Sequence, residues 1–225
     1  MGWLTRSLST SIGKKIIMAV TGLMLISFLF VHLVNNLLLF VSPGIFNSNV
    51  ENLESIKPLI RVVEVILALI FFFHIYNAVK LWWENRKANP KKYAINANSE
   101  NSSIYSRTTV WTGSIIFIFL AVHLSTFWRE FNFGEHLAGD PYPYYSIVAD
   151  AFANPFVAVL YLIAMIILGF HLNHGFQSSF QTFGWNHNKY FPIIKILGSA
   201  AAIFYAVGFA SIPIYFFVIS IGGGN

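Results

Sequence analysis

The hydrophobic positions of this chain fall into five long runs, and shorter polar stretches separate each run from the next. A run of about 20 apolar residues is long enough to cross the hydrocarbon core of a bilayer as a helix. Prolines, tryptophans or charged residues stand near the ends of the runs. The pattern therefore predicts an all-α integral membrane bundle. Its five spans are expected at residues 15–40, 58–83, 108–128, 155–176 and 192–220.

The composition agrees with this assignment and narrows the chemistry. Of 225 residues, 56% are hydrophobic and 10% are charged, whereas a soluble domain is nearer a quarter charged. The absence of cysteine excludes disulfides, thiolate metal sites and iron–sulfur clusters held by this chain. A redox centre in these helices would therefore be held by histidine. The net charge of +5 is small and gathers near the spans, so nucleic-acid binding is not expected, and no internal repeat is evident.

The basic residues predict the orientation of the chain. All but three of the 14 lysines and arginines fall on one side of the five spans, and the exceptions are Lys57, Arg61 and Arg129. Cytoplasmic segments of membrane proteins are enriched in lysine and arginine. The N-terminus is therefore predicted to be cytoplasmic, and the C-terminus, after five crossings, to lie outside. The first run is too long and too poorly flanked for a cleaved signal peptide.

Four histidines lie one apiece in the first four predicted spans, and ionisable residues at such depth are rare and usually functional. At 1.5 Å of rise per residue, His32 and His123 lie about 25 and 24 Å from the inner boundary. His74 and His171 each lie about 9 Å from it by the same rise. Depth therefore pairs His32 with His123 and His74 with His171. Because haem iron accepts imidazole ligands, this pattern predicts two haems b, roughly 15 Å apart along the membrane normal.

Histidines inside membrane spans can also have roles other than haem ligation. A single histidine in a span is explained equally well by a hydrogen bond to a neighbouring helix, but four at matched depths favour ligation. His174 competes with His171, because residues at i and i+3 share a helix face. Its depth, almost at the interface, favours a haem propionate contact or a role as alternative ligand. The arrangement of cytochrome b in quinol–cytochrome c reductases is rejected, because no span carries two histidines about four turns apart.

Two parts of the chain resemble a known family. Four short stretches resemble the first helix of that family, namely Ser11-Ile-Gly-Lys-Lys15, Met18-Ala-Val-Thr-Gly22, His32-Leu33 and Asn36-Leu37. The end of its fourth helix is resembled by His171-x-x-x-Gly175-Phe and Thr182-Phe-Gly184-Trp185. The family is the five-helix, dihaem cytochrome b anchor of succinate dehydrogenases and fumarate reductases, the type B form of complex II. The resemblance covers essentially the whole chain, and its H-x-x-x-G feature favours His171 over His174.

This resemblance implies a multi-pass subunit of the bacterial plasma (inner) membrane. A flavoprotein subunit with covalent FAD and an iron–sulfur subunit would dock on the cytoplasmic face, and the flavoprotein would oxidise the succinate of the tricarboxylic acid cycle. Electrons would then pass to the inner haem of His74 and His171, to the outer haem of His32 and His123, and to a membrane quinone, expected to be menaquinone. The basic segment 86–92 is interpreted either as a docking surface or as a topology signal alone.

Reduction of a quinone also needs a proton donor, and Glu64 is the expected one. It lies ten residues before His74, about 15 Å toward the outside, at a depth where an acid is costly unless it is used or paired. The alternative is a pair with Arg61 at i−3. Further residues expected to line the quinone pocket are Asn35, Asn36 and Trp128. If quinone is reduced near the outer haem with outside protons, the membrane potential drives the reaction by roughly 2.3 kcal/mol per 100 mV.

Three alternatives stay open. The same parts could run in reverse as a fumarate reductase, although an acid found two residues before the fourth histidine in some fumarate-reducing relatives is replaced here by Gly169. A haem anchor of a hydrogenase or formate dehydrogenase would keep the haems and change the partner. A haem-free, proton-coupled transporter would need discontinuous helices. The last span alone is interrupted, at Gly198, Gly208 and Pro213, and it carries no histidine.

Overall fold

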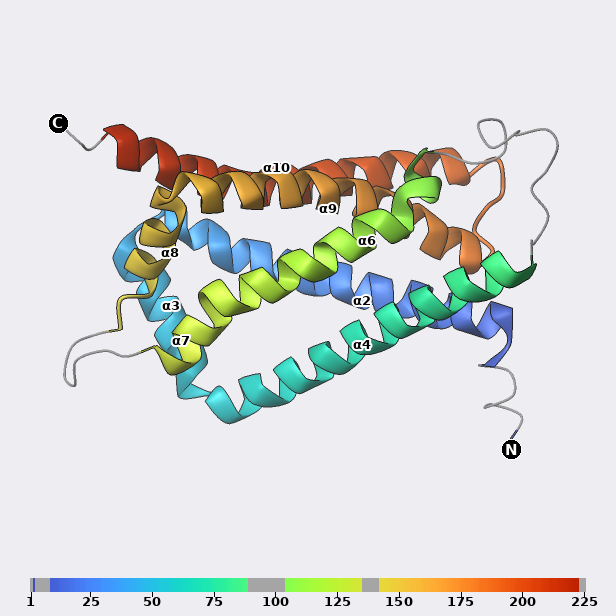
Figure 1. The fold of residues 1–225 in the computed structure, drawn as a ribbon, viewed down its shortest axis with the longest axis horizontal. Helices are drawn as coiled ribbons and strands as arrows, with labels where there is room; N and C mark the ends of the chain where they lie inside the picture. Colours follow the sequence, from blue (N-terminus) through green and yellow to red (C-terminus); the bar gives the residue numbers. More distant parts are fainter. Residues whose placement is uncertain (1, 3–8, 89–103, 135–141, 223–225) are drawn as a thin grey trace. The chain divides into compact units, whose positions relative to one another are not determined.

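The computed structural model describes residue 2 and residues 9–88, 104–134 and 142–222. Within these residues every regular element is helical, and five helices are long and apolar enough to cross a membrane (Figure 1). The five are α2 (Ser11–Leu37), α4 (Lys57–Ala88), α6 (Ile104–His123), α9 (Pro155–Thr182) and α10 (Phe191–Gly222). The prediction of an all-helical chain with five helices of membrane-spanning length and composition is confirmed, and the protein is of the multi-pass membrane type.

Two of the long helices continue into turns of different geometry. After α2 comes a 3-10 turn, η1 (Leu38–Phe40), and after α6 comes a π-helical turn, η2 (Leu124–Trp128), which leads into α7 (Arg129–Phe133). A π turn closes its hydrogen bonds one residue later than an α turn, and such turns are frequent at functional sites. The π turn here begins directly after His123, so it changes the direction of the side chains that follow this histidine.

The ends of the helices follow from local chemistry. Pro43 and Pro155 are the first residues of α3 (Pro43–Ser55) and α9, where the fixed φ and missing N–H of proline suit a first turn. The Ser42 hydroxyl accepts a hydrogen bond from the Ile45 N–H at 3.1 Å and caps α3. At the other end of α9, Gly184 has a φ of +84°. Glycine adopts this left-handed conformation without a steric penalty, and it terminates many helices in this way.

Contacts divide the chain into two compact units, and every long helix contributes to both. Unit 1 consists of Met1–Phe28, Val63–Gly113 and Phe170–Ala202, and unit 2 of Leu29–Val62, Ser114–Gly169 and Ile203–Asn225. The histidines divide evenly between the units. His74 and His171 belong to unit 1, and His32 and His123 belong to unit 2.

Unit 1 has a polar interior. Its almost fully buried polar side chains are Lys14, Thr21, Asn77 and Ser179. Each of them has a partner, as buried polar groups require. Lys14 forms an ion pair with Glu84 that joins α2 to α4, and the Asn77 amide donates to a backbone carbonyl of its own helix at 2.8 Å. Polar contacts between helices, such as the one between Lys14 and Glu84, hold membrane helices together where a hydrophobic driving force is absent.

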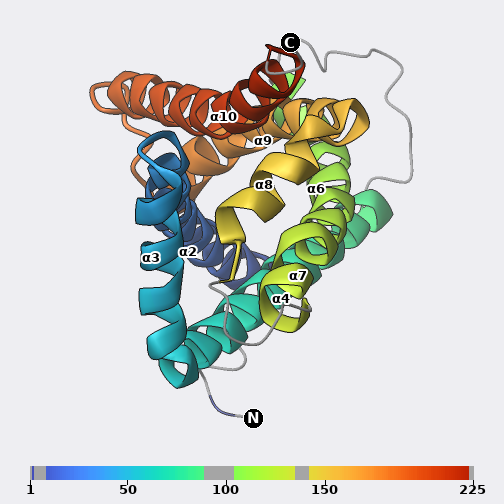
Figure 2. The ribbon, with the colours of Figure 1, turned by 90° about the vertical axis from the view of Figure 1, so that its left-hand side faces the viewer.

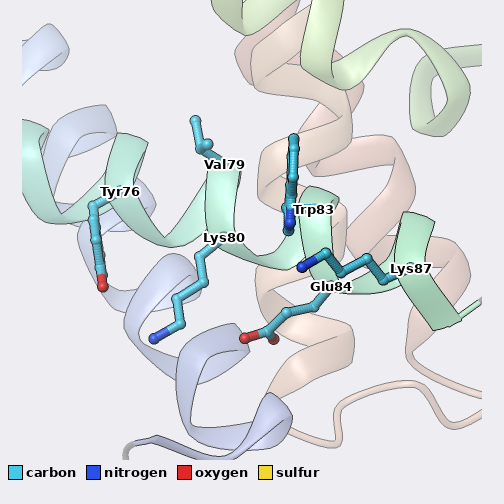
Figure 3. Close-up of a pocket in the computed structure, with 6 residues that line it drawn as sticks. All are labelled: Tyr76, Val79, Lys80, Trp83, Glu84 and Lys87. Carbon is cyan, nitrogen blue, oxygen red and sulfur yellow. The ribbon is translucent and has the colours of Figure 1, made fainter.

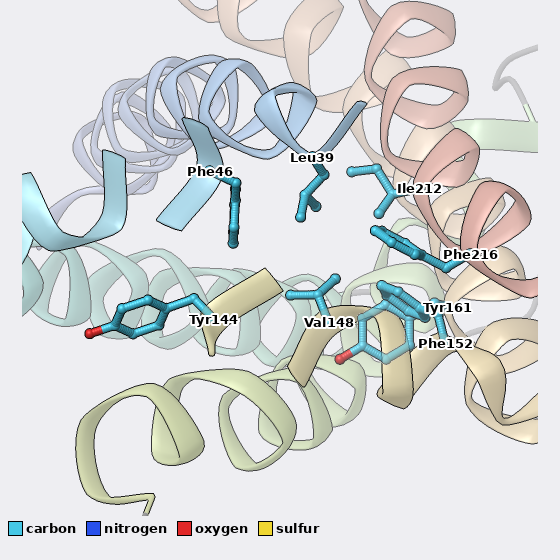
Figure 4. Close-up of a cluster of buried hydrophobic side chains, with 8 residues drawn as sticks. All are labelled: Leu39, Phe46, Tyr144, Val148, Phe152, Tyr161, Ile212 and Phe216. Carbon is cyan, nitrogen blue, oxygen red and sulfur yellow. The ribbon is translucent and has the colours of Figure 1, made fainter. Parts of the chain in front are cut away.

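Unit 2 is built around aromatic and aliphatic side chains. Figure 4 shows its main cluster, which consists of Leu39, Phe46, Tyr144, Val148, Phe152, Tyr161, Ile212 and Phe216. Much of it comes from α3 and α8 (Tyr144–Ala153), which pack against each other (Figure 2). The Tyr145 N–H donates to Asn47 Oδ1 at 2.9 Å and ties these two helices together. Both helices occupy segments that the hydrophobic pattern assigned to connections between spans, and both are too short to cross a membrane.

Candidate functional site

His74 of α4 and His171 of α9 lie together in unit 1. Their ring centroids are 6.4 Å apart and their planes are inclined by 75°. Both side chains are half-buried. His174 lies one turn further along α9 and is also half-buried, but the ring that lies against His74 is that of His171.

A threonine from another helix holds each ring of this pair. The Thr21 hydroxyl of α2 lies 3.1 Å from His74 Nδ1, and the Thr112 hydroxyl of α6 lies 3.2 Å from His171 Nδ1. Each hydroxyl also donates to a backbone carbonyl of its own helix, at 2.7 and 3.0 Å respectively. A hydroxyl has a single proton to donate, so each threonine accepts from its imidazole. The tautomer with hydrogen on Nδ1 and a lone pair on Nε2 is the one that satisfies both contacts of each threonine.

The residue after each of these threonines is a glycine that makes room for the imidazole. A Cβ atom added at Gly22 would lie 3.4 Å from His74 Cε1, and one added at Gly113 would lie 3.3 Å from His171 Cε1. A methyl group would already be in tight contact at position 113, and a longer side chain would displace the ring. Threonine and glycine together thus form a cradle, which we call the Thr–Gly cradle, at 21–22 and again at 112–113.

His32 of α2 and His123 at the end of α6 lie together in unit 2. Their ring centroids are 5.8 Å apart and their planes are perpendicular, at 90°. The polar contacts of Nδ1 are longer in this pair. Asn36 Nδ2 lies 3.5 Å from His32 Nδ1, and Tyr161 Oη lies 3.4 Å from His123 Nδ1. Contacts of this length are weak hydrogen bonds at most.

Aromatic side chains position the unit 2 pair. The Phe209 ring lies 5.7 Å from that of His32. The rings of Phe119, Phe127 and Tyr161 lie 5.9, 5.7 and 6.0 Å from that of His123. Ring centroids at such distances are in the favourable range for offset and edge-to-face contacts. The two histidine pairs therefore share a geometry but differ in their surroundings, which are hydroxylic in unit 1 and aromatic in unit 2.

The donor set of each pair would suit a haem, because haem iron accepts imidazole ligands. An imidazole nitrogen binds a first-row metal at about 2 Å, so two rings on one iron have centroids roughly 6 Å apart, close to the observed 5.8 and 6.4 Å. Rotation about each metal–nitrogen bond leaves the angle between the ring planes free. In unit 1 a hydrogen on Nδ1 would leave Nε2 free to bind the iron, which is the usual arrangement when a second group orients a metal-binding histidine.

The number of protein ligands also favours haem over a free metal ion. Among the residues that the structure describes, no three or more His, Cys, Asp or Glu side chains gather as a metal site would require. Protein zinc sites use three or four side chains. Two imidazoles suffice where a macrocycle supplies the remaining ligands, as in haem proteins.

The residues predicted for quinone chemistry are divided between the units. Glu64 is half-buried on α4 and belongs to unit 1, whereas Asn35, Asn36 and Trp128 belong to unit 2. Asn36 donates its amide to the carbonyl oxygen of His32 at 2.7 Å. Trp128 lies in the π turn η2. A common quinone pocket for these four residues stays a prediction.

Arg61, which the sequence offered as a partner for Glu64, also contacts Asn132 and Trp128 inside unit 2. Its guanidinium donates to Asn132 Oδ1 at 2.6 Å and stands 5.7 Å from the centre of the Trp128 ring. Both contacts join α4 to the segment that follows His123. They hold Trp128 and the π turn in place through a charge-assisted hydrogen bond and a cation–π contact.

The last turns of α4 carry a shallow groove of aromatic and basic side chains. Figure 3 shows its lining, which consists of Tyr76, Val79, Lys80, Trp83, Glu84 and Lys87 and encloses about 410 Å³. The Lys80 ammonium lies 5.6 Å from the Tyr76 ring centre, and that of Lys87 lies 5.4 Å from the Trp83 ring centre. Interleaved aromatic and basic residues are typical of the interface between membrane and water. Residues 89–92 of the basic segment lie outside the described part of the chain.

Sequence reasoning missed the supporting residues Thr112, Gly113 and Tyr161, and it used Thr21 and Gly22 only as part of a family-like motif. A signal for them exists. A Thr-Gly pair at 21–22 is followed ten residues after the glycine by His32, and the pair at 112–113 is followed at the same distance by His123. This is a short internal repeat, so the expectation of no repeat needs correction. The repeat is difficult to recognise without the structure, because two residues and a distant histidine recur by chance in many helices.

Comparisons of the chain with protein-family models, with curated proteins and with solved structures found no match.

Proposed function

We propose that this protein is a dihaem cytochrome b that anchors a succinate:quinone oxidoreductase in a bacterial plasma membrane. The observation that carries the proposal is the presence of two histidine pairs, each drawn from two helices and each with the ring separation that one iron requires. The resemblance of the Ser11–Leu37 and His171–Trp185 regions to the cytochrome b anchors of this enzyme class supports the particular complex.

Each histidine pair would hold one haem b through its two imidazoles. When bound, haem b accepts and gives up one electron at a time, which suits it to link an iron–sulfur subunit with a membrane quinone. The protein's own contribution is to fix the ligands. In unit 1, Thr21 and Thr112 hold both imidazoles in the metal-binding tautomer. In unit 2, aromatic side chains confine the rings of His32 and His123 and keep water away.

The N-terminus and the basic end of α4 are assigned to the cytoplasmic face, where the flavoprotein and iron–sulfur subunits would dock. Three positive side chains on the last turns of α4 support this assignment, and they are Lys80, Arg86 and Lys87. The acid among them, Glu84, is already paired with Lys14. An acidic surface of a partner subunit would therefore meet uncompensated positive charge.

Menaquinone is proposed as the electron acceptor, with Glu64 as the residue that supplies a proton to the ring. Glu64 is half-buried on a helix of membrane-spanning length, and an acid in such a position is functional by default. Gly169 stands where a proton-carrying acid is found in some fumarate-reducing relatives, so succinate oxidation is the favoured direction.

The continuity of α10 argues against a proton-coupled transporter. This helix runs unbroken from Phe191 to Gly222, through Gly198, Gly208 and the almost fully buried Pro213. Transporters bind substrates and ions where helices are broken near the middle of the membrane. The glycines of α10 serve packing instead, because a Cβ atom at Gly208 would lie 2.8 Å from Leu33 Cδ2.

A dithionite-reduced minus oxidised spectrum with a pyridine haemochrome assay tests the proposal. The purified chain is expected to hold two haems b. His74→Ala and His123→Ala should each remove a different haem, because the substituted ligands belong to different units. A chain without haem would overturn the proposal, and loss of the same centre in both variants would overturn the pairing.

Purification of the native complex tests the partner assignment. A flavoprotein with covalent FAD and an iron–sulfur protein should accompany the chain, and the complex should reduce a menaquinone analogue with succinate. A nickel- or molybdenum-containing partner would retain the two haems but replace succinate dehydrogenase by another membrane oxidoreductase.

A further inference from the structure

The Thr–Gly cradle and the downstream histidine occur at the same spacing in α2 and α6. Thr21 precedes His32 by eleven residues, and Thr112 precedes His123 by eleven residues. Eleven residues are just over three turns of a helix, at 3.6 residues per turn, so the threonine and the histidine lie on the same face. Each of these two helices thus carries two functional residues on one face. One is a threonine that contacts a histidine of another helix, and the other is a histidine of its own.

We infer that Thr21 and Thr112 are positioning residues that set the redox potential of the proposed unit 1 haem through their hydrogen bonds to His74 and His171. The inference rests on the proposed haem function. It assigns a role to two hydrogen bonds between helices that the sequence did not predict. Thr21 is almost fully buried, so water cannot readily replace its hydroxyl. The contact pair is duplicated, with nearly equal distances of 3.1 and 3.2 Å.

The direction of the effect follows from the chemistry of imidazole. A hydrogen bond from Nδ1–H to a hydroxyl oxygen pulls the proton away from the ring and makes Nε2 a more basic ligand. A more basic ligand favours ferric over ferrous iron and lowers the potential. Removal of the acceptor should therefore raise the potential of the unit 1 haem. In the unit 2 pair, Nδ1 of His32 and of His123 lies 3.5 and 3.4 Å from Asn36 and Tyr161 instead, so the unit 2 haem should not respond to these two substitutions.

The test is a potentiometric titration of the purified native complex with Thr21→Val, Thr112→Val and Thr21→Ser. Valine keeps the shape of threonine and removes only the hydroxyl, whereas serine keeps the hydroxyl. Each valine variant should raise the midpoint potential of one haem by about 59 mV, which is a tenfold change in the preference for ferric iron. The serine variant should match the wild type. The component that His74→Ala removes identifies the unit 1 haem.

Ser27→Ala is the matched control on the same helix. Ser27 donates to the Leu23 carbonyl at 3.0 Å, the same intrahelical bond that Thr21 makes, but it stands on an exposed face. The inference is overturned if Ser27→Ala shifts the potential equally, or if both haems keep their potentials in the valine variants. Loss of the unit 1 haem in Thr21→Val supports the inference when Thr21→Ser retains it, and overturns it when Thr21→Ser loses it too. Absence of haem from the wild type would remove the proposed function and this inference together.

Discussion

Two threonine hydroxyls determine which nitrogen of the unit 1 histidines carries hydrogen. Neutral imidazole has two tautomers, and the hydrogen bond at one nitrogen selects the atom that is left to bind a metal. Because the hydroxyls of Thr21 and Thr112 donate to backbone carbonyls, their contacts with the rings favour the tautomer in which Nε2 is the acceptor. In unit 2 the Nδ1 atoms lie at longer range from Asn36 and Tyr161, at 3.5 and 3.4 Å. The aromatic neighbours there control position and leave the tautomer less strongly determined.

Gly113→Val should remove the proposed unit 1 haem selectively. A Cβ atom at this position would lie 3.3 Å from His171 Cε1, so the branched side chain must push the imidazole off its axis. Misplaced ligands and supports cost roughly 10–100-fold in metal affinity. Haem content by the haemochrome assay should therefore fall from two to about one per chain. Gly44→Ala is the control, since position 44 has open space around it, and a loss of both haems from Gly113→Val would contradict the prediction.

At the scale of the elements, the ion pair between Lys14 and Glu84 fastens α2 to α4. The two partners are not equivalent, because the Lys14 side chain is 7% exposed and that of Glu84 is 38% exposed. Removal of Glu84 leaves a buried ammonium without its counter-charge, whereas removal of Lys14 leaves a carboxylate that water can reach. The cost of breaking such a pair therefore depends on which residue is replaced.

Glu84→Gln should consequently lower thermal stability more than Lys14→Met. A fully buried pair costs about 3–5 kcal/mol when one partner is removed, and water around Glu84 reduces this to about 1–3 kcal/mol. Thermal unfolding in detergent, followed by helical circular dichroism, measures the order. The double variant Lys14→Met/Glu84→Gln should recover part of the loss, because no unpaired charge remains. Equal loss in both single variants would show that the buried ammonium does not determine the cost.

The elements of unit 2 show a different way of joining helices. Leu33 is 0% exposed and lies against Gly208, so α2 and α10 approach closely at a point where one of them has no side chain. Small residues allow this kind of contact between membrane helices. The aromatic cluster packs α3 and α8 into the same unit. These two helices are too short to cross a membrane.

At the scale of the whole molecule, the chain's lack of cysteine allows its orientation to be measured directly. Ser48→Cys on α3 and Asn186→Cys between α9 and α10 are both exposed. With the N-terminus cytoplasmic, a membrane-impermeant maleimide should label Ser48→Cys in intact cells, and Asn186→Cys only after the membrane is opened. The reverse labelling pattern would place the N-terminus outside and move the proposed docking face with it.

The hydrophobic pattern and the position of histidine within it are enough to predict five helices and to pair the histidines by depth. Both depend on the regular rise of a helix and on bilayer thickness, which are the same for every membrane protein. The predictions were less complete between the spans, where α3 and α8 form. Their stability comes from aromatic packing with distant residues such as Phe216, and no local periodicity signals such contacts.

The sequence by itself determined which segments form the five long apolar helices and which histidines lie together, because these depend on the order of residues along each helix. Only the tertiary structure decided which side chains support those histidines. Thr21 and His74 are 53 residues apart, and Thr112 and His171 are 59 apart, so their contacts depend on how the helices turn toward one another. The rotation of a helix about its axis is set by packing with its neighbours, and hydropathy carries little information about it.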